Sequence, residues 1–493
     1  MGLNAWDFLV IAGYLAAVTL FGLRFRRRET TLQGYFLADR KISWWAISLS
    51  IVAAETSTLT IISVPGLAYE QDFRFLQLIF GYIAGRVIVA FLLVPHYFRG
   101  ELITAYQLMD RRFGHRLRTF TAGLFLVTRA AAEGVRVFAV AIVVRIALGS
   151  LLSGMSDLGR DVAAIAIVTL LTLVYTFEGG MAAVIWTDVV QLVMYLAGAI
   201  TAGFVLCRLT PGGWTALASA SVHAGKFRVL DFSWNLYSNY TFWSGVIGGA
   251  FLTTASHGTD QLIVQRLLAA RNQWQAKLAI VSSGIAVFFQ FGLFLLIGAM
   301  LFSFYVLVPD APRFSRTDTI FPAFVATRMP HLVSGFVIAA ILAAAMSNLS
   351  AALNSLSSTA VVDFYARLRP QSTEQHRVRI SRISTVGWAV LLFSLALLAR
   401  HGGMVLEMGL SIVSVAYGAL LGVFLLGVLS ARASERGAMA GMIFGFALNV
   451  WLWQFTRVAF TWYVVFGSIA TFLVGYGASL LMPDRRVLAR GRA

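Results

Sequence analysis

The sequence predicts an all-α membrane protein with about thirteen transmembrane helices, and three observations lead to this fold class. Of the 493 residues, 59% are hydrophobic and only 12% are charged, and the mean hydropathy is +0.78. A soluble domain carries about 25% charged residues. The apolar residues come in repeated runs of about 20, the length that a helix needs to cross roughly 30 Å of hydrocarbon. The runs are continuous, which favours helices over the alternating pattern of membrane strands.

The basic residues predict the topology. The net charge of +17 would suit nucleic acid, but the charges lie in short loops between apolar runs, so the lipid bilayer is the expected partner and nucleic acid is not. The first run, 5–23, has its arginines after it, at Arg24 and 26–28. This order predicts an uncleaved anchor with the N-terminus outside. The inside loops then hold about 25 of the 39 Lys and Arg residues, which places the C-terminus in the cytoplasm and the protein in the inner (plasma) membrane.

The chain is expected to form one membrane domain, 1–493. The predicted spans are 5–23, 43–69, 75–98, 119–148, 161–178, 182–207, 241–265, 277–308, 331–362, 381–400, 404–430, 437–456 and 460–482.

Two of these spans, 43–69 and 241–265, stand five spans apart and are both interrupted. The first contains Glu55 to Thr58 and Pro65-Gly66, and the second contains Gly248-Gly249 and Thr253 to Gln261. Paired broken helices at corresponding positions are typical of inverted-repeat transporters with a site near the bilayer midplane. The core repeats then cover about 43–207 and 241–430, and the spans 5–23, 437–456 and 460–482 are peripheral.

The ninth span carries a polar face. Ser347, Ser350 and Asn354 lie at i, i+3 and i+7, so they share one side of a helix. Hydroxyl and amide oxygens in this position suit a hard cation such as sodium. The alternative is close helix packing, which also favours serine and alanine and uses asparagine between helices.

Acidic and basic residues inside apolar spans are further candidates, because charges there are expensive and mark functional sites. Glu55 would pair with a cation, bind a proton or support the unwound backbone, and Asp188 would bind a second cation, line the exit route or anchor a helix. Arg129, Glu133 and Arg136 share a face of the fourth span. Glu133 neutralises only one arginine fully, so the remaining charge suits a substrate carboxylate. A structural ion-pair lattice is the alternative, as it is for Arg86 in the third span.

Signals for an enzyme are weak. The seven histidines are scattered, the glycine-rich stretches follow no nucleotide-binding pattern, and the single cysteine, Cys207, excludes a multi-cysteine metal site. We therefore expect no catalytic activity and no cofactor.

Three patches resemble the sodium:solute symporters, a family of sugar, proline, pantothenate, iodide and sialic acid carriers. They are Tyr175 to Asp188 (YTFEGGMAAVIWTD), Gly258 to Arg266 (GTDQLIVQR) and Ala344 to Ser355 (AAMSNLSAALNS). The resemblance extends over about 5–482. It implies the leucine-transporter-like fold, a 5+5 inverted repeat that here follows one extra N-terminal helix.

The resemblance also implies ion and solute sites. Sodium, as the coupling ion, would bind backbone carbonyls of the first break and residues of the ninth span: Ala53, Thr56, Ala344, Ser347 and Asn348. Asn348 departs from the serine or threonine that the family usually has. A second sodium would use Asp188, Ser347 and Ser350. The solute region would comprise Glu55, Thr60, Tyr82, Arg136, Thr253 and Ser256.

The sugar-carrying branch is a poor match. Ser256 stands at the position of its inner-gate tyrosine and Thr253 at that of its sugar-binding asparagine. The expected function is therefore sodium-coupled symport of a small solute by alternating access, with Arg129 and Arg136 favouring a small organic anion. A proton-coupled carrier using Glu55 or Asp188, and a solute sensor with a transporter-like domain, are the alternatives. The sequence identifies neither the solute nor the oligomeric state.

Overall fold

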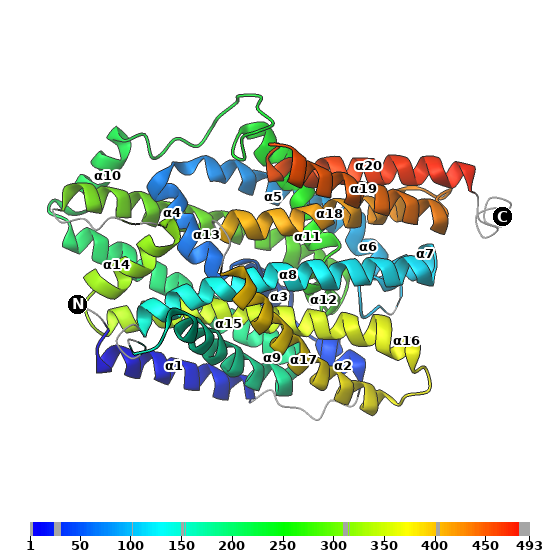
Figure 1. The fold of residues 1–493 in the computed structure, drawn as a ribbon, viewed down its shortest axis with the longest axis horizontal. Coiled ribbons are helices and arrows are strands. Elements are labelled where there is room, and N and C mark those ends of the chain that lie inside the picture. The colour runs from blue at the N-terminus through cyan, green and yellow to red at the C-terminus, as the bar shows by residue number, and fades with distance from the viewer. Residues whose placement is uncertain are drawn as a thin grey trace.

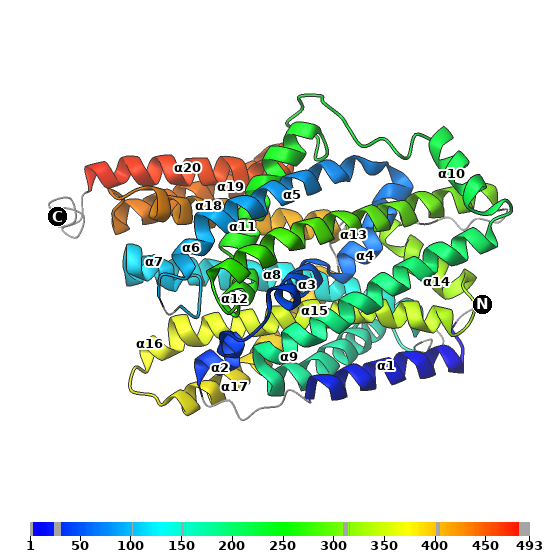
Figure 2. The same ribbon diagram turned by 180° about the vertical axis from the view of Figure 1, so that it is seen from behind.

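The computed structural model describes residues 3–23, 31–100, 102–148, 152, 154–308, 314, 316–400 and 405–482, without the side chains of 147, 174, 175, 177–179 and 405–408. These residues form helices and no β-strand, as predicted. The long helices lie side by side along the long axis, with α1 beginning at one end of the bundle and α20 ending at the other (Figure 1, Figure 2).

The α-helices are α1 (Ala5–Leu23), α2 (Leu32–Leu37), α3 (Trp44–Glu55), α4 (Thr58–Glu70), α5 (Leu76–Ile88), α6 (Val94–Tyr97), α7 (Gln107–Arg112), α8 (His115–Ala147), α9 (Asp157–Leu209), α10 (Gly213–His223), α11 (Gly249–Gly258), α12 (Gln261–Leu268), α13 (Gln273–Leu307), α14 (Ile320–Arg328), α15 (Val333–Thr359), α16 (Ala366–Leu368), α17 (Glu374–Ala399), α18 (Val405–Leu429), α19 (Glu435–Phe455) and α20 (Phe460–Leu481).

The first broken helix consists of α3 and α4, which are bent by 63° at Thr56 and Ser57. Both residues have extended backbone angles, so the break predicted at Glu55 to Thr58 is confirmed. The predicted interruption at Pro65-Gly66 is wrong, because α4 continues through Pro65. Neighbouring helices in a membrane bundle can satisfy the backbone groups that a proline frees.

The second broken helix runs from the π-helical turn η4 (Ser244–Gly248) through α11 to α12. Its break lies at Thr259 and Asp260, and the Asp260 side chain accepts a hydrogen bond from the Leu262 backbone at the start of α12. The Gly248-Gly249 pair does not break the helix, since η4 passes directly into α11 there. One of the two predicted interruptions in this span is therefore confirmed.

Helix α9 joins two predicted spans, 161–178 and 182–207, through a sharp kink at Gly180. Gly180 has a φ of +56°, and a Cβ atom there would lie 2.6 Å from the Tyr35 carbonyl oxygen. Both facts favour glycine at this turn. The kink brings the second half of α9 against α3 and α15.

Helix α15 is the centre of the bundle, because its side chains are buried along almost its whole length. It packs against α1, α3, α8, α9 and α12. Among the described residues, eight helices are long and apolar enough to cross a membrane, or nine with the bent pair α3–α4. The number of thirteen spans therefore stays a prediction, as α8 carries several charges and α1 is a shorter apolar helix.

Candidate functional site

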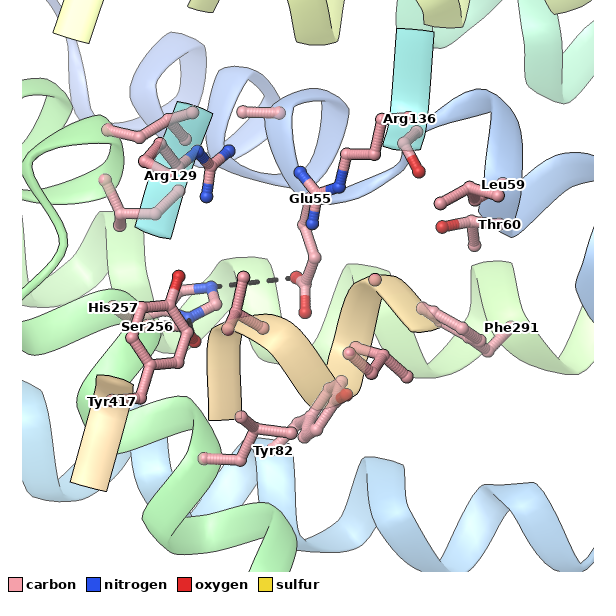
Figure 3. Close-up of a pocket in the computed structure, with 18 of the residues that line it drawn as sticks. Glu55, Leu59, Thr60, Tyr82, Arg129, Arg136, Ser256, His257, Phe291 and Tyr417 are labelled. Carbon is pink, nitrogen blue, oxygen red and sulfur yellow. Dashed lines mark hydrogen bonds and ion pairs between the residues drawn. The ribbon is translucent and has the colours of Figure 1, made fainter. Parts of the chain in front are cut away.

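A cavity of about 100 Å³ lies between the two helix breaks and α8. Residues of the first break, α4, α5, α8, α11, α12, α13 and α18 line it. Figure 3 shows Glu55, Arg136 and His257 directed toward its middle. Much of the remaining lining is apolar, including Phe75, Leu252 and Phe291. The cavity thus offers a few polar groups on an apolar wall, which is the usual design of a small-molecule site.

Arg129 is held by two acids. Its Nη2 lies 2.6 Å from Glu133, and its Nη1 lies 3.1 Å from Asp260 in the second break. The Tyr417 hydroxyl also donates to Asp260, at 2.5 Å. We predicted that Glu133 would neutralise only one of the two arginines and leave the other for a ligand. For Arg129 this prediction is wrong, because Asp260 pairs with it as well. Asp260, which was not predicted as a partner, supplies the second negative charge.

Arg136 is bound more loosely. Its Nη1 donates to Glu133 at 2.9 Å and to the amide oxygen of Asn348 at 3.2 Å. The Asn348 amide in turn donates to Glu133 at 2.7 Å. Within the described part of the chain, the Nε and Nη2 atoms of Arg136 have no hydrogen-bond partner, and the side chain is 18% exposed and lines the cavity. The Nε and Nη2 donors of Arg136 therefore remain for a ligand, and Asn348 faces a guanidinium.

Glu55 lies at the end of α3 and pairs with Arg86. Arg86 is fully buried and also donates to Ser283 at 3.1 Å and to the Tyr82 carbonyl at 3.3 Å. The His257 Nε2 atom lies 3.7 Å from the Glu55 carboxylate, as the dashed line in Figure 3 indicates. Arg86 thus holds Glu55 in place, which agrees with the alternative prediction that Arg86 is part of a structural ion pair.

Asp188 is the centre of a second buried network. Arg266 in α12 lies 2.8 Å from its carboxylate, and neither side chain is exposed. Ser347 in α15 donates to Asp188 at 2.6 Å, and Ser50 in α3 donates to it as well. Arg266 also donates to Ser50 at 2.8 Å. This network links both broken helices to α9 and α15.

The predicted sodium ligands lie in this region. Ala53, Ala344 and Ser347 are fully buried, on α3 and α15, which pack together. The Thr56 hydroxyl donates to the Val52 carbonyl at 2.8 Å and accepts a hydrogen bond from Gln290.

Two buried hydroxyls near the predicted sodium ligands, those of Thr58 and Ser350, have no hydrogen-bond partner among the described residues. Buried polar atoms are normally paired, so these two oxygens are candidates for ion or solute contacts. Ser350 was predicted as a ligand of the second sodium, whereas Thr58 was predicted only as part of the helix break.

Five of the six residues predicted for the solute region line the cavity: Glu55, Thr60, Tyr82, Arg136 and Ser256. Thr253 does not, because its side chain is buried against Gly85 of α5. Ser57 and His257 are lining residues that sequence analysis missed. Ser57 follows Thr56 in the first helix break, and His257 follows Ser256 on α11, so both could have been predicted from these neighbours.

A cavity that lies between two broken helices is the arrangement typical of secondary transporters. The chain belongs to the sodium:solute symporter family, whose model matches residues 35–445. It is a sodium-coupled symporter of a small solute and not an enzyme.

Several relatives support this assignment. The sodium/sialic acid symporter NanT of Aliivibrio fischeri is 30% identical over 95% of this chain and 92% of its own length. The human sodium/iodide cotransporter is 28% identical over 91% of this chain and 70% of its own. A mouse sodium-coupled monocarboxylate transporter is 27% identical over 91% and 73%.

Solved structures agree with the fold. The substrate-bound, outward-open state of a sodium-coupled sialic acid symporter, described as having a novel sodium site, matches with a TM-score of 0.86 at 27% identity, over 97% of this chain and 98% of that one. A nucleobase-cation-symport-1 family transporter matches with a TM-score of 0.55 at 14% identity, over 90% and 93%. The leucine-transporter-like fold is therefore established for this chain.

The buried pair of Asp188 and Arg266 generates a testable prediction. We expect Arg266→Gln to lower stability by about 3–5 kcal/mol, because it leaves a buried carboxylate without its countercharge. The double variant Asp188→Asn, Arg266→Gln should recover at least half of this loss, since it removes both charges. Thermal unfolding of the purified protein measures the effect. A double variant less stable than Arg266→Gln would contradict a charge-pairing role.

Proposed function

We propose that this symporter carries a small organic anion together with sodium, by alternating access, with Arg136 binding a carboxylate of the solute. The single observation behind this proposal is the guanidinium of Arg136, which lines the cavity and whose Nε and Nη2 atoms have no partners among the described residues. A planar guanidinium binds a carboxylate through two parallel hydrogen bonds. Ser57 and Thr60 lie on the same cavity wall and would donate to further solute oxygens.

The sodium site that we propose comprises the backbone carbonyls of Ala53 and Thr56 together with Ala344, Ser347 and Asn348. The contact between Arg136 and Asn348 suggests how solute and ion would be coupled. A solute carboxylate draws the guanidinium away from Asn348, and the amide oxygen is then available to sodium. Solute and sodium would each raise the affinity for the other, because such coupling is reciprocal.

A second sodium site is proposed at Asp188, Ser347 and Ser350. The unpaired hydroxyl of Ser350 supports it. Arg266, 2.8 Å from Asp188, opposes it by adding like charge, so this site should be the weaker of the two.

The relatives suggest which anions to test first. Their names include carriers of sialic acid, iodide and monocarboxylates. The apolar share of the cavity wall favours solutes with apolar carbon over densely hydroxylated ones. We also propose an N-terminus outside and a cytoplasmic C-terminus in the cell membrane, based on the basic loops.

A screen of solutes tests the proposed function directly. Purified protein is heated with sialic acid, short monocarboxylates, iodide and neutral sugars, in sodium or in potassium buffer. We expect an organic carboxylate to raise the melting temperature in sodium and not in potassium. Stabilisation by neutral sugars alone would contradict the anion proposal, and stabilisation independent of sodium would contradict the coupling.

Arg136 is the sharpest test of the solute site. We expect Arg136→Ala to lower carboxylate affinity at least about 30-fold, because a buried charge-assisted pair is worth roughly 2–5 kcal/mol. Arg136→Lys should recover little, since an ammonium lacks the planar fork. Binding of the solute found in the screen measures the loss, and sodium-dependent stabilisation without solute should survive. Solute affinity within twofold of the parent protein would assign Arg136 a structural role.

Ser347 tests the ion site. Replacing it with alanine removes a hydroxyl oxygen, and we expect the sodium concentration for half-maximal uptake to rise about tenfold, equivalent to about 1.4 kcal/mol. Ser355→Ala is the matched control on the same helix, because within the described part of the chain its hydroxyl donates only to the Ala352 carbonyl. Uptake into proteoliposomes at varied sodium measures both variants. An unchanged sodium response in Ser347→Ala would exclude Ser347 as a ligand.

A further inference from the structure

A second cavity lies on the flank of the bundle, between α1, α8, α9 and α15, and takes no part in the proposed transport site. Its volume is about 270 Å³, and all eleven lining residues are apolar. Its floor consists of Val144, Val168, Leu342 and Met346, which are at most 7% exposed. Its rim includes Ala12 on α1 and Ile167 on α9, and both are exposed.

Water is a poor occupant of this cavity. A buried water molecule needs two to four polar partners, and the lining provides no polar side chain. An apolar cavity of about 150 Å³ in a soluble protein already stays dry and takes up apolar guests, and this cavity is larger. An apolar guest is therefore the expected occupant.

The rim is continuous with the surface that faces the hydrocarbon of the bilayer. On α1, Leu9 and Leu20 are 61% and 68% exposed, and on α9 Leu170 is 62% exposed. These exposed apolar side chains lie on the two helices that carry the rim, so the substance that reaches the opening in a membrane is the acyl chain of a lipid.

Charged residues lie next to the cavity, at the end of α8 and the start of α9. Arg145 directly follows the floor residue Val144 and pairs with Asp157 and Asp161, each at 3.0 Å. Arg400 lies 3.5 Å from Asp161. Arg160 lies 3.9 Å from Asp157, so among the described residues three arginines gather around two aspartates at this end of α8 and α9. Guanidinium groups gathered in this way suit a phosphate group.

We propose that this cavity binds one acyl chain of a membrane phospholipid, whose phosphate lies near Arg145. The chain would enter between α1 and α9 and end against Met346. Met346 precedes Ser347 of the proposed sodium site, and Val168 separates the chain from a smaller cavity lined by Ser57, Arg136 and Asn348. The bound lipid is thus placed to stabilise the position of α15.

Photolabelling tests the proposal without depending on the solute. The protein is placed in nanodiscs of phosphatidylcholine that carries a diazirine at the end of one acyl chain, and labelled peptides are identified by mass spectrometry. We expect labels on Leu342 or Met346 of α15, because a chain at the outer surface cannot reach these buried residues. Labels confined to exposed residues such as Leu9 and Leu20 would overturn the proposal.

A matched pair of variants sharpens the result. Ala12→Phe places a ring in the opening, and we expect it to lower labelling of α15 at least about fivefold, since close packing leaves no room for both groups. Ala17→Phe adds the same ring to an exposed position of α1 outside the cavity lining and should leave labelling unchanged. Unchanged folding of both is checked by thermal unfolding. Equal labelling of α15 in the two variants would also overturn the proposal. Leu15→Trp is an independent second variant that should block the cavity, because Leu15 lines it.

Discussion

The buried ion pair of Asp188 and Arg266 is the interaction on which the rest of the central structure depends. In a bilayer no solvent is available to satisfy a broken helix, so exposed backbone groups and charges must find partners inside the protein. Arg266 lies just after the second break, and Ser50, a hydrogen-bond partner of both charged groups, lies on the helix before the first. A single charge pair therefore fixes the two irregular segments relative to each other and to α15.

From this fixed centre the transport site follows. The break at Thr56 and Ser57 places Ser57 in the cavity wall, and the break at Thr259 directs Asp260 toward Arg129 of α8. Asp260 and Glu133 both pair with Arg129, and Glu133 together with Asn348 also holds Arg136. The same polar groups that compensate for the breaks thus form one wall of the solute cavity.

Much of this arrangement was predictable because it depends on local pattern. Polar residues inside apolar runs located both breaks, and helical spacing brought Arg129, Glu133 and Arg136 together. The pairing of Arg129 with Asp260 was not predictable, since the two residues are 131 positions apart and no periodicity relates them. Pro65 and Gly248 were misleading for another reason. Both are helix breakers in isolation, but packed neighbours, and the π-helical turn at Gly248, accommodate them within continuous helices.

The balance of charge around the cavity has an energetic consequence. Glu55, Glu133 and Asp260 are matched by Arg86, Arg129 and Arg136, so the site contributes no net charge of its own. With these charged pairs staying in place, the charge moved in each cycle would be the charge of the cargo. One sodium with one monovalent anion would be electroneutral, and the membrane potential, worth about 2.3 kcal/mol per charge at 100 mV, would add nothing to accumulation. With a monovalent anion, a second sodium per cycle would make transport electrogenic, and the membrane potential would then drive accumulation.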